Sequence, residues 1–278
     1  MARLKLPEPY DFALSTERFR AFGPDLANLW DGEALLRAVD GREVRIAPAP
    51  GGVEVEPLDR ATAPVVRKLL GAELDLVGFS HFAAGTDPVL ARLATALAGL
   101  RPPLAPDPFE ALVGSITAQQ VSMFSAFAIR SPLVERLGTR VGRVYAFPTR
   151  DRLAAAGPEE LVAVGFSRRK AEYTVALARS DLDLGGLAGL GDEDIRARLT
   201  ALPGIGEWTV DWFLARHLGR PRAWPAGDLA LRKAVSVFYR HGEAMRTDEV
   251  RAFGARFEPF QNLSAHYLLT GLRVSPPT

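Results

Sequence analysis

One segment of this sequence combines residue types that could bind an anion. Leu202-Pro203-Gly204-Ile205-Gly206 stands between two stretches with helical periodicity, 192–201 and 207–218. Two glycines around one apolar residue allow a hairpin too tight for larger side chains, and Ile205 would pack inward. The backbone N–H groups of the hairpin and of the following helix would then face outward, where they suit a phosphate. The alternative is an ordinary corner between two helices, since Pro-Gly breaks are common.

Asp228 is a carboxylate at the expected start of a helix. It lies 22 residues after Gly206 (228 − 206) and precedes the apolar periodicity of Leu229 and Leu231. From spacing alone, a helix N-cap is the simplest role for it. A helix N-terminus also favours a charged carboxylate. Such a group is a poor general acid, but it can stabilise a developing cation and orient or deprotonate a water molecule.

Two tryptophans and two glutamines have positions that allow more than one role. Trp208 and Trp212 are four residues apart and therefore share one face of a helix; core packing is the commonest role of such a pair. Gln119 and Gln120 fall inside a single amphipathic helix expected over 108–129. A polar pair in the middle of a helix is most often a solvated face.

The elements that must position these residues divide the chain into two domains. Residues 1–86 predict a small mixed α/β domain with an antiparallel sheet. In this domain we expect a hairpin of the strands 43–46 and 53–56 and a further strand over Tyr10–Leu14. Helices are expected over 27–39 and 60–70. This part carries no P-loop, G-x-S-x-G or HExxH motif. Residues 87–278 predict an all-helical domain and thus an α+β fold class, with helices beginning at Asp87-Pro88 and at Asp107-Pro108, where Glu110 would complete a capping box. Further helices are expected over 133–138, 158–164, 167–179, 192–201, 207–218, 228–240, 247–256 and 260–272.

Charge is distributed unevenly between the two domains. The 278 residues carry a formal net charge of +1. Residues 1–87 hold 10 basic and 14 acidic residues (−4), and residues 88–278 hold the other 24 and 19 (+5). The window 196–240 alone holds 8 basic and 3 acidic residues (+5). Thirty of the 34 basic residues are arginine, which suits phosphate but also follows from GC-rich codon usage. The uneven split indicates an anionic partner for the second domain.

Other classes of protein are excluded by composition. The absence of cysteine excludes disulfides, Cys-ligated zinc, iron–sulfur clusters and thiol nucleophiles. The four histidines lack metal-ligand spacing. No apolar run approaches the ~20 residues that a membrane span needs, and the first nine residues are too polar for a signal peptide. We therefore expect a soluble cytoplasmic protein.

From about Pro103 to Arg273 the sequence resembles the helix-hairpin-helix DNA glycosylases, specifically the 3-methyladenine DNA glycosylase II type. Three motifs carry the resemblance in the right order: 115–122 (SITAQQVS), 202–209 (LPGIGEWT) and 224–233 (WPAGDLALRK). It implies a helix-hairpin-helix glycosylase domain over 87–278, with the active-site cleft between its two helical lobes. It also implies base excision repair of double-stranded DNA that contains damaged bases, by a cytoplasmic, nucleoid-associated monomer.

The resemblance assigns the catalytic role to Asp228 and implies a monofunctional enzyme. Such an enzyme flips a nucleotide and hydrolyses its N-glycosidic bond. Bifunctional relatives carry a Schiff-base lysine at the position after Glu207; here it is Trp208, and the nearest lysine in sequence is Lys233. Without a general acid, the favoured leaving groups already carry positive charge, which indicates alkylated purines of the 3-methyladenine and 7-methylguanine class.

The same resemblance implies the remaining site residues. The base pocket would be walled by Trp208, Trp212, Phe124, Leu229 and Leu269, with indole rings that attract a cationic purine. Gln120 falls where a side chain fills the gap left by the flipped nucleotide. The other implied DNA contacts are Pro203, Gly204, Ile205, Gly206, Thr209 and Arg232. No cofactor and no catalytic metal are implied, although a monovalent ion could bind the carbonyls of Leu202 and Ile205.

Two departures from the family pattern leave alternatives open. Glu207 replaces a basic or neutral residue beside the expected phosphate, and Leu269 stands where a pocket tryptophan is common. The pocket is therefore expected to be wider or less selective for cations. The alternatives are a non-catalytic helix-hairpin-helix DNA-binding repair factor and a glycosylase for deaminated or oxidised bases.

Overall fold

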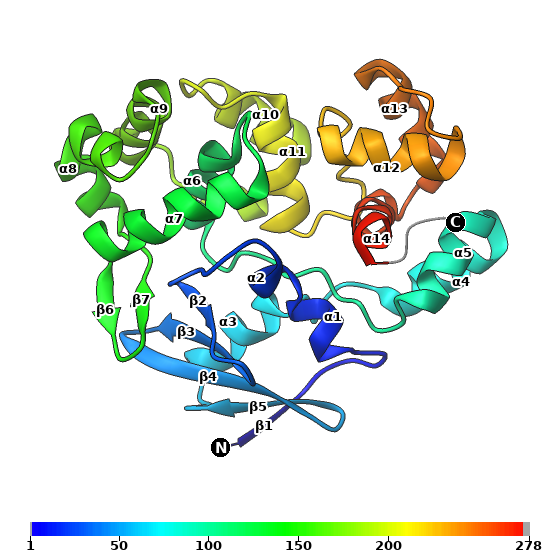
Figure 1. Ribbon diagram of the computed structural model, residues 1–278, viewed down its shortest axis with the longest axis horizontal. Coiled ribbons are helices and arrows are strands. Elements are labelled where there is room, and N and C mark those ends of the chain that lie inside the picture. The colour runs from blue at the N-terminus through cyan, green and yellow to red at the C-terminus, as the bar shows by residue number, and fades with distance from the viewer. Residues whose placement is uncertain (1, 275–278) are drawn as a thin grey trace.

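A computed structural model describes residues 2–274. Figure 1 shows an antiparallel sheet at one end of the molecule and the helices α6 to α14 beyond it. The strands pair in the order β1-β5-β4-β3-β2. The elements of this N-terminal domain are β1 (Ala2–Lys5), α1 (Phe12–Thr16), α2 (Arg18–Ala21), β2 (Asn28–Trp30), β3 (Leu35–Val39), β4 (Arg42–Ala49), β5 (Gly52–Glu56) and α3 (Thr62–Leu69).

The structure confirms the predicted hairpin and corrects two other expectations for this domain. Strands β4 and β5 pair with Ile46 opposite Val55. Residues 27–39 are not a helix but two strands, because the Asp31 carboxylate accepts two backbone N–H groups of the following turn, where Gly32 has a φ of 105°. Residues 10–14 are not a strand, since Asp11 caps α1 by accepting the N–H of Leu14 at 2.8 Å.

The rest of the described chain is mostly helical, as predicted. Its helices are α4 (Leu76–Thr86), α5 (Pro88–Ala96), α6 (Pro108–Ala118), α7 (Met123–Leu137), α8 (Arg150–Ala163), α9 (Arg168–Arg179), α10 (Asp192–Thr200), α11 (Glu207–Arg216), α12 (Leu229–Tyr239), α13 (Thr247–Gly254) and α14 (Gln261–Val274). A hairpin of β6 (Thr139–Val141) and β7 (Val144–Ala146) was not expected, so this domain is not purely α. The α+β fold class is confirmed. In residues 2–274, none of the helices has the length and apolar character needed to cross a membrane.

The single helix expected over 108–129 is wrong. Helix α6 ends at Ala118, Gln120 adopts a φ of 55°, and α7 begins after Ser122, whose hydroxyl accepts the N–H of Ser125 at 3.1 Å. A positive φ at a residue other than glycine is uncommon and marks a position fixed by its surroundings. The break turns Gln120 outward at the end of a helix instead of placing it along one.

Two hydrophobic cores lie on either side of a short segment after α3. The first holds the inward residues of the sheet and of α1 to α3 and ends at Ala72. The second begins at Leu76 and extends to Leu269. Helix α4 therefore packs with the second core, upstream of the domain boundary expected at residues 86 and 87.

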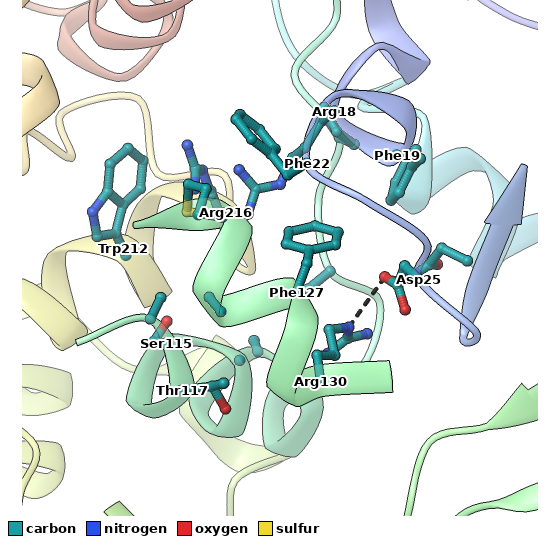
Figure 2. A pocket seen from close by; sticks show the side chains of 18 of the residues that line it. Arg18, Phe19, Phe22, Asp25, Ser115, Thr117, Phe127, Arg130, Trp212 and Arg216 are labelled. Atoms are coloured by element: carbon teal, nitrogen blue, oxygen red, sulfur yellow. Dashed lines mark hydrogen bonds and ion pairs between the residues drawn. The ribbon is translucent and has the colours of Figure 1, made fainter. Parts of the chain in front are cut away.

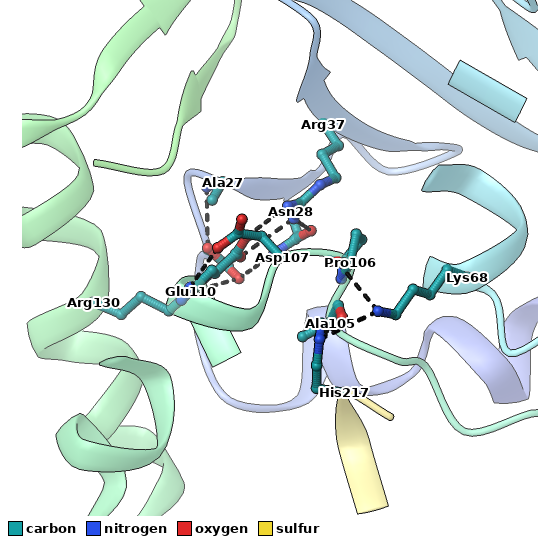
Figure 3. Close-up of polar contacts among 11 residues, drawn as sticks. Ala27, Asn28, Arg37, Lys68, Ala105, Pro106, Asp107, Glu110, Arg130 and His217 are labelled. Atoms are coloured by element: carbon teal, nitrogen blue, oxygen red, sulfur yellow. Dashed lines mark hydrogen bonds and ion pairs between the residues drawn. The ribbon is translucent and has the colours of Figure 1, made fainter. Parts of the chain in front are cut away.

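A buried ionic cluster joins the two parts (Figure 3). Glu110 does not complete a capping box, because its carboxylate binds Arg37 of β3 and Arg130 of α7, each at 2.5 Å. Arg130 also binds Asp25 at 3.1 Å. Burial alone would raise the pKa of Glu110, but the two guanidinium groups hold it at about 2. The cluster fixes the N-terminal domain against α6 and α7.

Candidate active site

A cavity of about 320 Å³ lies where the N-terminal domain meets α6, α7, α11 and α14 (Figure 2). One wall comes from α2 and the residue that ends it, with Arg18, Phe19 and Phe22. Phe127, Trp212 and residues of α14 line other sides. This contribution of the first domain was not anticipated from the sequence, because no motif in residues 1–86 marks it.

Asp228 is the N-cap of α12, as its position in the sequence predicts. Its Oδ1 accepts the backbone N–H groups of Ala230 at 2.9 Å and Leu231 at 3.0 Å. Its Oδ2 accepts the indole N–H groups of Trp208 and Trp212, each at 3.0 Å. Four donors therefore surround the carboxylate, a set that matches the ionised form because that form only accepts.

An open groove adjoins the cavity and shares Asp228 and Trp208 with it. The groove is lined by Gln120, the hairpin residues 202–206, Tyr173 of α9 and Leu229. Asp228 thus lies where the cavity meets an exposed surface. This is the position that a carboxylate needs in order to reach a bond between an inserted group and a chain that remains in the groove.

The hairpin between α10 and α11 has the geometry predicted for it. Gly204 has a φ of 78°, and a Cβ there would lie 2.1 Å from the ring of Tyr173. Ile205 is buried, as expected, whereas Pro203 and Gly206 are exposed. Gly206 is the N-cap of α11 and has no side chain to occupy the first amides of that helix. The hairpin therefore presents backbone N–H groups to the groove.

Gln119 joins the hairpin to the break between α6 and α7. Its side-chain amide donates to the carbonyl of Gly204 at 2.8 Å and to the hydroxyl of Thr209 at 3.1 Å. Thr209 is almost fully buried and lies in the floor of the groove, where its hydroxyl accepts this bond. These bonds hold Gln120, the next residue, beside the hairpin.

Arg216 lies against the ring of Trp212 on the side of the cavity. Its guanidinium carbon is 3.7 Å from the centroid of the Trp212 ring, and its Nε donates to His266 Nε2 at 3.4 Å. Burial and the charge of Arg18 lower the pKa of Arg216 well below its ordinary value. Burial and the charge of Arg216 lower the pKa of His266 to about 3, so this imidazole is a neutral acceptor. The scattered histidines of the sequence gave no sign of this arrangement.

Of the other predicted pocket residues, only Leu269 lines the cavity. Leu269 is buried and lines the cavity with both tryptophans. Leu229 is 75% exposed and lines the groove instead. Phe124 is 63% exposed and is not among the residues that line the cavity; its ring meets Phe22 edge-on at 5.6 Å. Phe127, one turn further on, takes the position expected of Phe124.

Three other predicted residues have partners within the chain. Arg232 donates through Nε and one terminal nitrogen to the carbonyl of Met245, which limits its reach toward DNA. Glu207 pairs with Arg251 at 2.9 Å, so its charge beside the hairpin is balanced. The carbonyl of Leu202 accepts the N–H of Ile205 at 3.2 Å. A monovalent ion at this carbonyl stays a prediction.

Comparison with known proteins places this geometry in a family. Residues 113–259 match the family described as HhH-GPD superfamily base excision DNA repair protein. The DNA-3-methyladenine glycosylase of Bacillus subtilis is 29% identical over 202 residues, which cover 70% of this chain and 66% of that protein. DNA-3-methyladenine glycosylase 2 of Escherichia coli is 32% identical over 179 residues, 62% of this chain and 61% of that protein. The chain thus spans just under two thirds of the length of these relatives.

Two solved structures of 3-methyladenine DNA glycosylases are similar to this chain over a larger part of its length. The 3-methyladenine DNA glycosylase from Archaeoglobus fulgidus superposes with a TM-score of 0.90 and 28% identity and covers 100% of both chains. The Schizosaccharomyces pombe 3-methyladenine DNA glycosylase, solved with abasic DNA, has a TM-score of 0.64 and 26% identity over 72% of this chain. Because the family match covers more than half of the chain, including the hairpin and Asp228, this protein belongs to the HhH-GPD superfamily of base excision DNA repair proteins.

Proposed function

We propose that this protein is a monofunctional DNA glycosylase that hydrolyses the N-glycosidic bond of alkylated purines in double-stranded DNA after base flipping. The observation that carries the proposal is the position of Asp228, which lines both the cavity and the groove that contains the hairpin. The relatives named as 3-methyladenine glycosylases support the choice of substrate. The structure solved with abasic DNA supports DNA as the partner. In this proposal the protein acts as a monomer in the cytoplasm.

The groove and the cavity have separate roles in this mechanism. Backbone amides of the hairpin bind a phosphate of the damaged strand, and Gln120 enters the space that the flipped nucleotide leaves. The base occupies the cavity between the tryptophans and Phe127. The deoxyribose then lies at Asp228, where the cavity opens.

Asp228 acts on the sugar rather than on the base. As the bond between C1′ and the base nitrogen breaks, its electron pair leaves with the base, and positive charge develops on the sugar. The carboxylate stabilises that charge and orients a water molecule, which attacks C1′ and loses a proton to the carboxylate or to solvent. The four N–H donors hold the carboxylate in place, so it needs no rearrangement when the charge develops.

No lysine stands at the position that would form a Schiff base, because Trp208 occupies it and donates to Asp228. A lysine that the sequence did not single out, Lys170, lines the same groove. Its ammonium donates to the carbonyl of Thr117 at 2.9 Å, and burial lowers its pKa. Since that hydrogen bond holds it at the end of α6, the proposal stays with water as the nucleophile.

The test is a base-release assay with Asp228→Asn. We expect release of 7-methylguanine from a duplex to fall by at least a thousandfold while affinity for the duplex changes little, because the amide cannot stabilise a cation; this is about 4 kcal/mol of barrier or more. Asp248→Asn, an exposed position of α13, is the matched control, and thermal unfolding checks the fold of both variants.

The same assay separates the alternatives. Release at the wild-type rate by Asp228→Asn would show that another group is catalytic. A wild-type protein that binds DNA but releases no base from methylated, deaminated or oxidised duplexes would be the non-catalytic binding factor. Strand cleavage without alkali treatment would exclude a monofunctional enzyme.

A further inference from the structure

Three phenylalanine rings form a row that leads from solvent into the cavity. Phe127 is buried in the cavity wall, Phe22 lines the cavity and is half-buried, and Phe124 is 63% exposed. The ring centroid of Phe22 lies 5.9 Å from that of Phe127 and 5.6 Å from that of Phe124. None of the three belongs to either hydrophobic core of residues 2–274. The packing of the two domains therefore does not account for this row.

Phe124 is the outer end of the row. Among the aromatic side chains of residues 2–274, only that of Phe124 is exposed, and all others are buried or half-buried. A single exposed apolar side chain is common on a protein surface. This one differs because its ring continues into two rings that line the cavity.

Both domains hold the row in place. Phe22 is the residue that ends α2, whereas the other two rings belong to α7. The carbonyl of Pro24 accepts the hydroxyl of Ser131 at 2.7 Å, which fixes the turn after α2 against α7. The guanidinium carbon of Arg273 lies 5.5 Å from the ring centroid of Phe22. Figure 2 shows Phe22 and Phe127 on the same cavity.

The outer ring stands beside the place where the cavity meets the groove. Met123, the residue before Phe124, lines both of them, as Asp228 and Trp208 do. Phe124 itself lines neither. A group that moves from the groove into the cavity therefore passes next to this ring.

We propose that Phe124 and Phe22 form a stacking platform that receives a base after it leaves the duplex and before it enters the cavity, and that this transfer limits base release from a paired duplex. The inference rests on the proposed glycosylase function and adds a site outside the cavity. Stacking of bases on aromatic side chains tolerates any sequence, because every base has a π-face. The platform therefore accepts damaged and undamaged bases alike, and the choice between them is made in later steps.

The size and place of the platform fit a base in transit better than other occupants. Interfaces between proteins bury about 800 Å² on each partner, far more than one exposed ring offers. The base opposite the flipped nucleotide stays in the duplex beside Gln120, which lines the groove, whereas Phe124 does not.

The experiment measures single-turnover release of 7-methylguanine from two duplexes. In one the lesion pairs with cytosine, and in the other it lies opposite an abasic-site analogue, so that it leaves without breaking a pair. We expect wild type to act faster on the second duplex. Phe124→Ala should slow release from the paired duplex about five- to a hundredfold, the range of one base–aromatic stack, and change release from the second duplex little.

Three further variants separate stacking from other roles of the side chain. Phe124→Tyr keeps an aromatic ring and should keep the wild-type rate. Phe124→Leu keeps an apolar side chain without a ring and should behave like Phe124→Ala. Val77→Ala is the matched control, since Val77 is a 51% exposed apolar residue of α4 that lines neither the cavity nor the groove.

The outcomes distinguish this inference from the function on which it rests. A wild-type rate of Phe124→Ala on the paired duplex, or equal wild-type rates on both duplexes, would overturn the inference and leave the proposed function in place. Equal losses on both duplexes, or full activity of Phe124→Leu, would overturn it too, because the side chain would then act through the fold or by plain apolar contact. A wild type that releases no 7-methylguanine would overturn the proposed function and the inference with it.

Disulfide cross-linking identifies the base that reaches the platform. The chain has no cysteine, so Phe124→Cys introduces a single thiol. The probe is a duplex with an alkyl disulfide tether on either the target base or the base opposite to it. The protein thiolate attacks the tether, joins the DNA through a new disulfide and releases the small thiol. We expect faster cross-linking to the target base, with Val77→Cys as control; faster cross-linking to the opposite base would overturn the inference.

Discussion

At the scale of single residues, the carboxylate of Asp228 depends on both of its sets of donors. The helix amides bind one oxygen, and the two indole N–H groups bind the other, so the tryptophans position the carboxylate that we propose to be catalytic, in addition to lining the cavity. Spacing alone could predict that the pair shares a helix face. It could not predict that both ring nitrogens reach one oxygen of a residue 16 and 20 positions away.

Trp208→Phe tests this dependence because it removes one N–H donor and keeps an aromatic ring. A hydrogen bond to a charged group contributes about 1.5–3 kcal/mol. We therefore expect the rate of base release at saturating enzyme to fall about ten- to a hundredfold, measured by single-turnover kinetics. Trp30→Phe, which lies in the N-terminal sheet and does not line the cavity, serves as control; equal losses in the two variants would mean that Trp208 acts through stability.

At the scale of elements, the hairpin packs closely against Tyr173 of α9, which leaves no room for a side chain at Gly204. Its sequence predicted the turn, the inward Ile205 and the start of α11. The adjoining break at 119–122 was missed, since periodicity favoured one continuous helix. At the end of α6, Gln119 bonds to the Gly204 carbonyl, which is distant in sequence. The spacing of apolar residues cannot predict such a contact.

Gly204→Ala should weaken DNA binding strongly. The added Cβ would clash with the Tyr173 ring, and the φ of 78° adds backbone strain of about 1 kcal/mol or more. We expect affinity for an undamaged duplex to fall at least tenfold, with a shallower dependence on salt because phosphate contacts are lost. Gly85→Ala, in α4 and away from the groove, is the matched control, since its Cβ meets open space. Equal affinities of the two variants would contradict the role of the hairpin.

At the scale of the whole molecule, two cores and a buried ionic cluster hold one cavity between them. The order of the two domains and most helices could be predicted from local patterns such as Asp-Pro starts. The wall that α2 contributes could not, because Arg18 and Phe127 meet across more than a hundred residues of chain. Pairing across that separation depends on how the domains pack, which Arg37, Glu110 and Arg130 determine.

The stability of the folded chain should decrease below neutral pH. Burial lowers the pKa of His266 to about 3 and, with the charge of Lys68, that of His217 to about 4, both from an ordinary 6.5. The unfolded chain therefore binds protons that the folded chain does not. This contribution to stability is complete above pH 6.5 and is lost as pH falls toward 4 and 3.

The size of this pH effect can be measured by urea unfolding. Each histidine should lower the free energy of unfolding by about 2 kcal/mol between pH 7 and pH 5. His217→Gln should remove about that much of the difference, whatever its effect on stability at pH 7. His81→Gln, at an exposed position, should keep the full difference, and identical pH slopes for wild type and His217→Gln would contradict the assignment.

The shared cavity also bears on how such a protein can diversify. Asp228, the hairpin and the tryptophans belong to the helical part, whereas Arg18, Phe19 and Phe22 belong to a domain with its own core. Mutations in α2 can therefore reshape the cavity while the proposed catalytic carboxylate and the proposed DNA contacts of the hairpin stay unchanged. Substitutions in the N-terminal domain can therefore change which lesion the cavity accepts, independently of substitutions in the helical part, which change how the bond is broken.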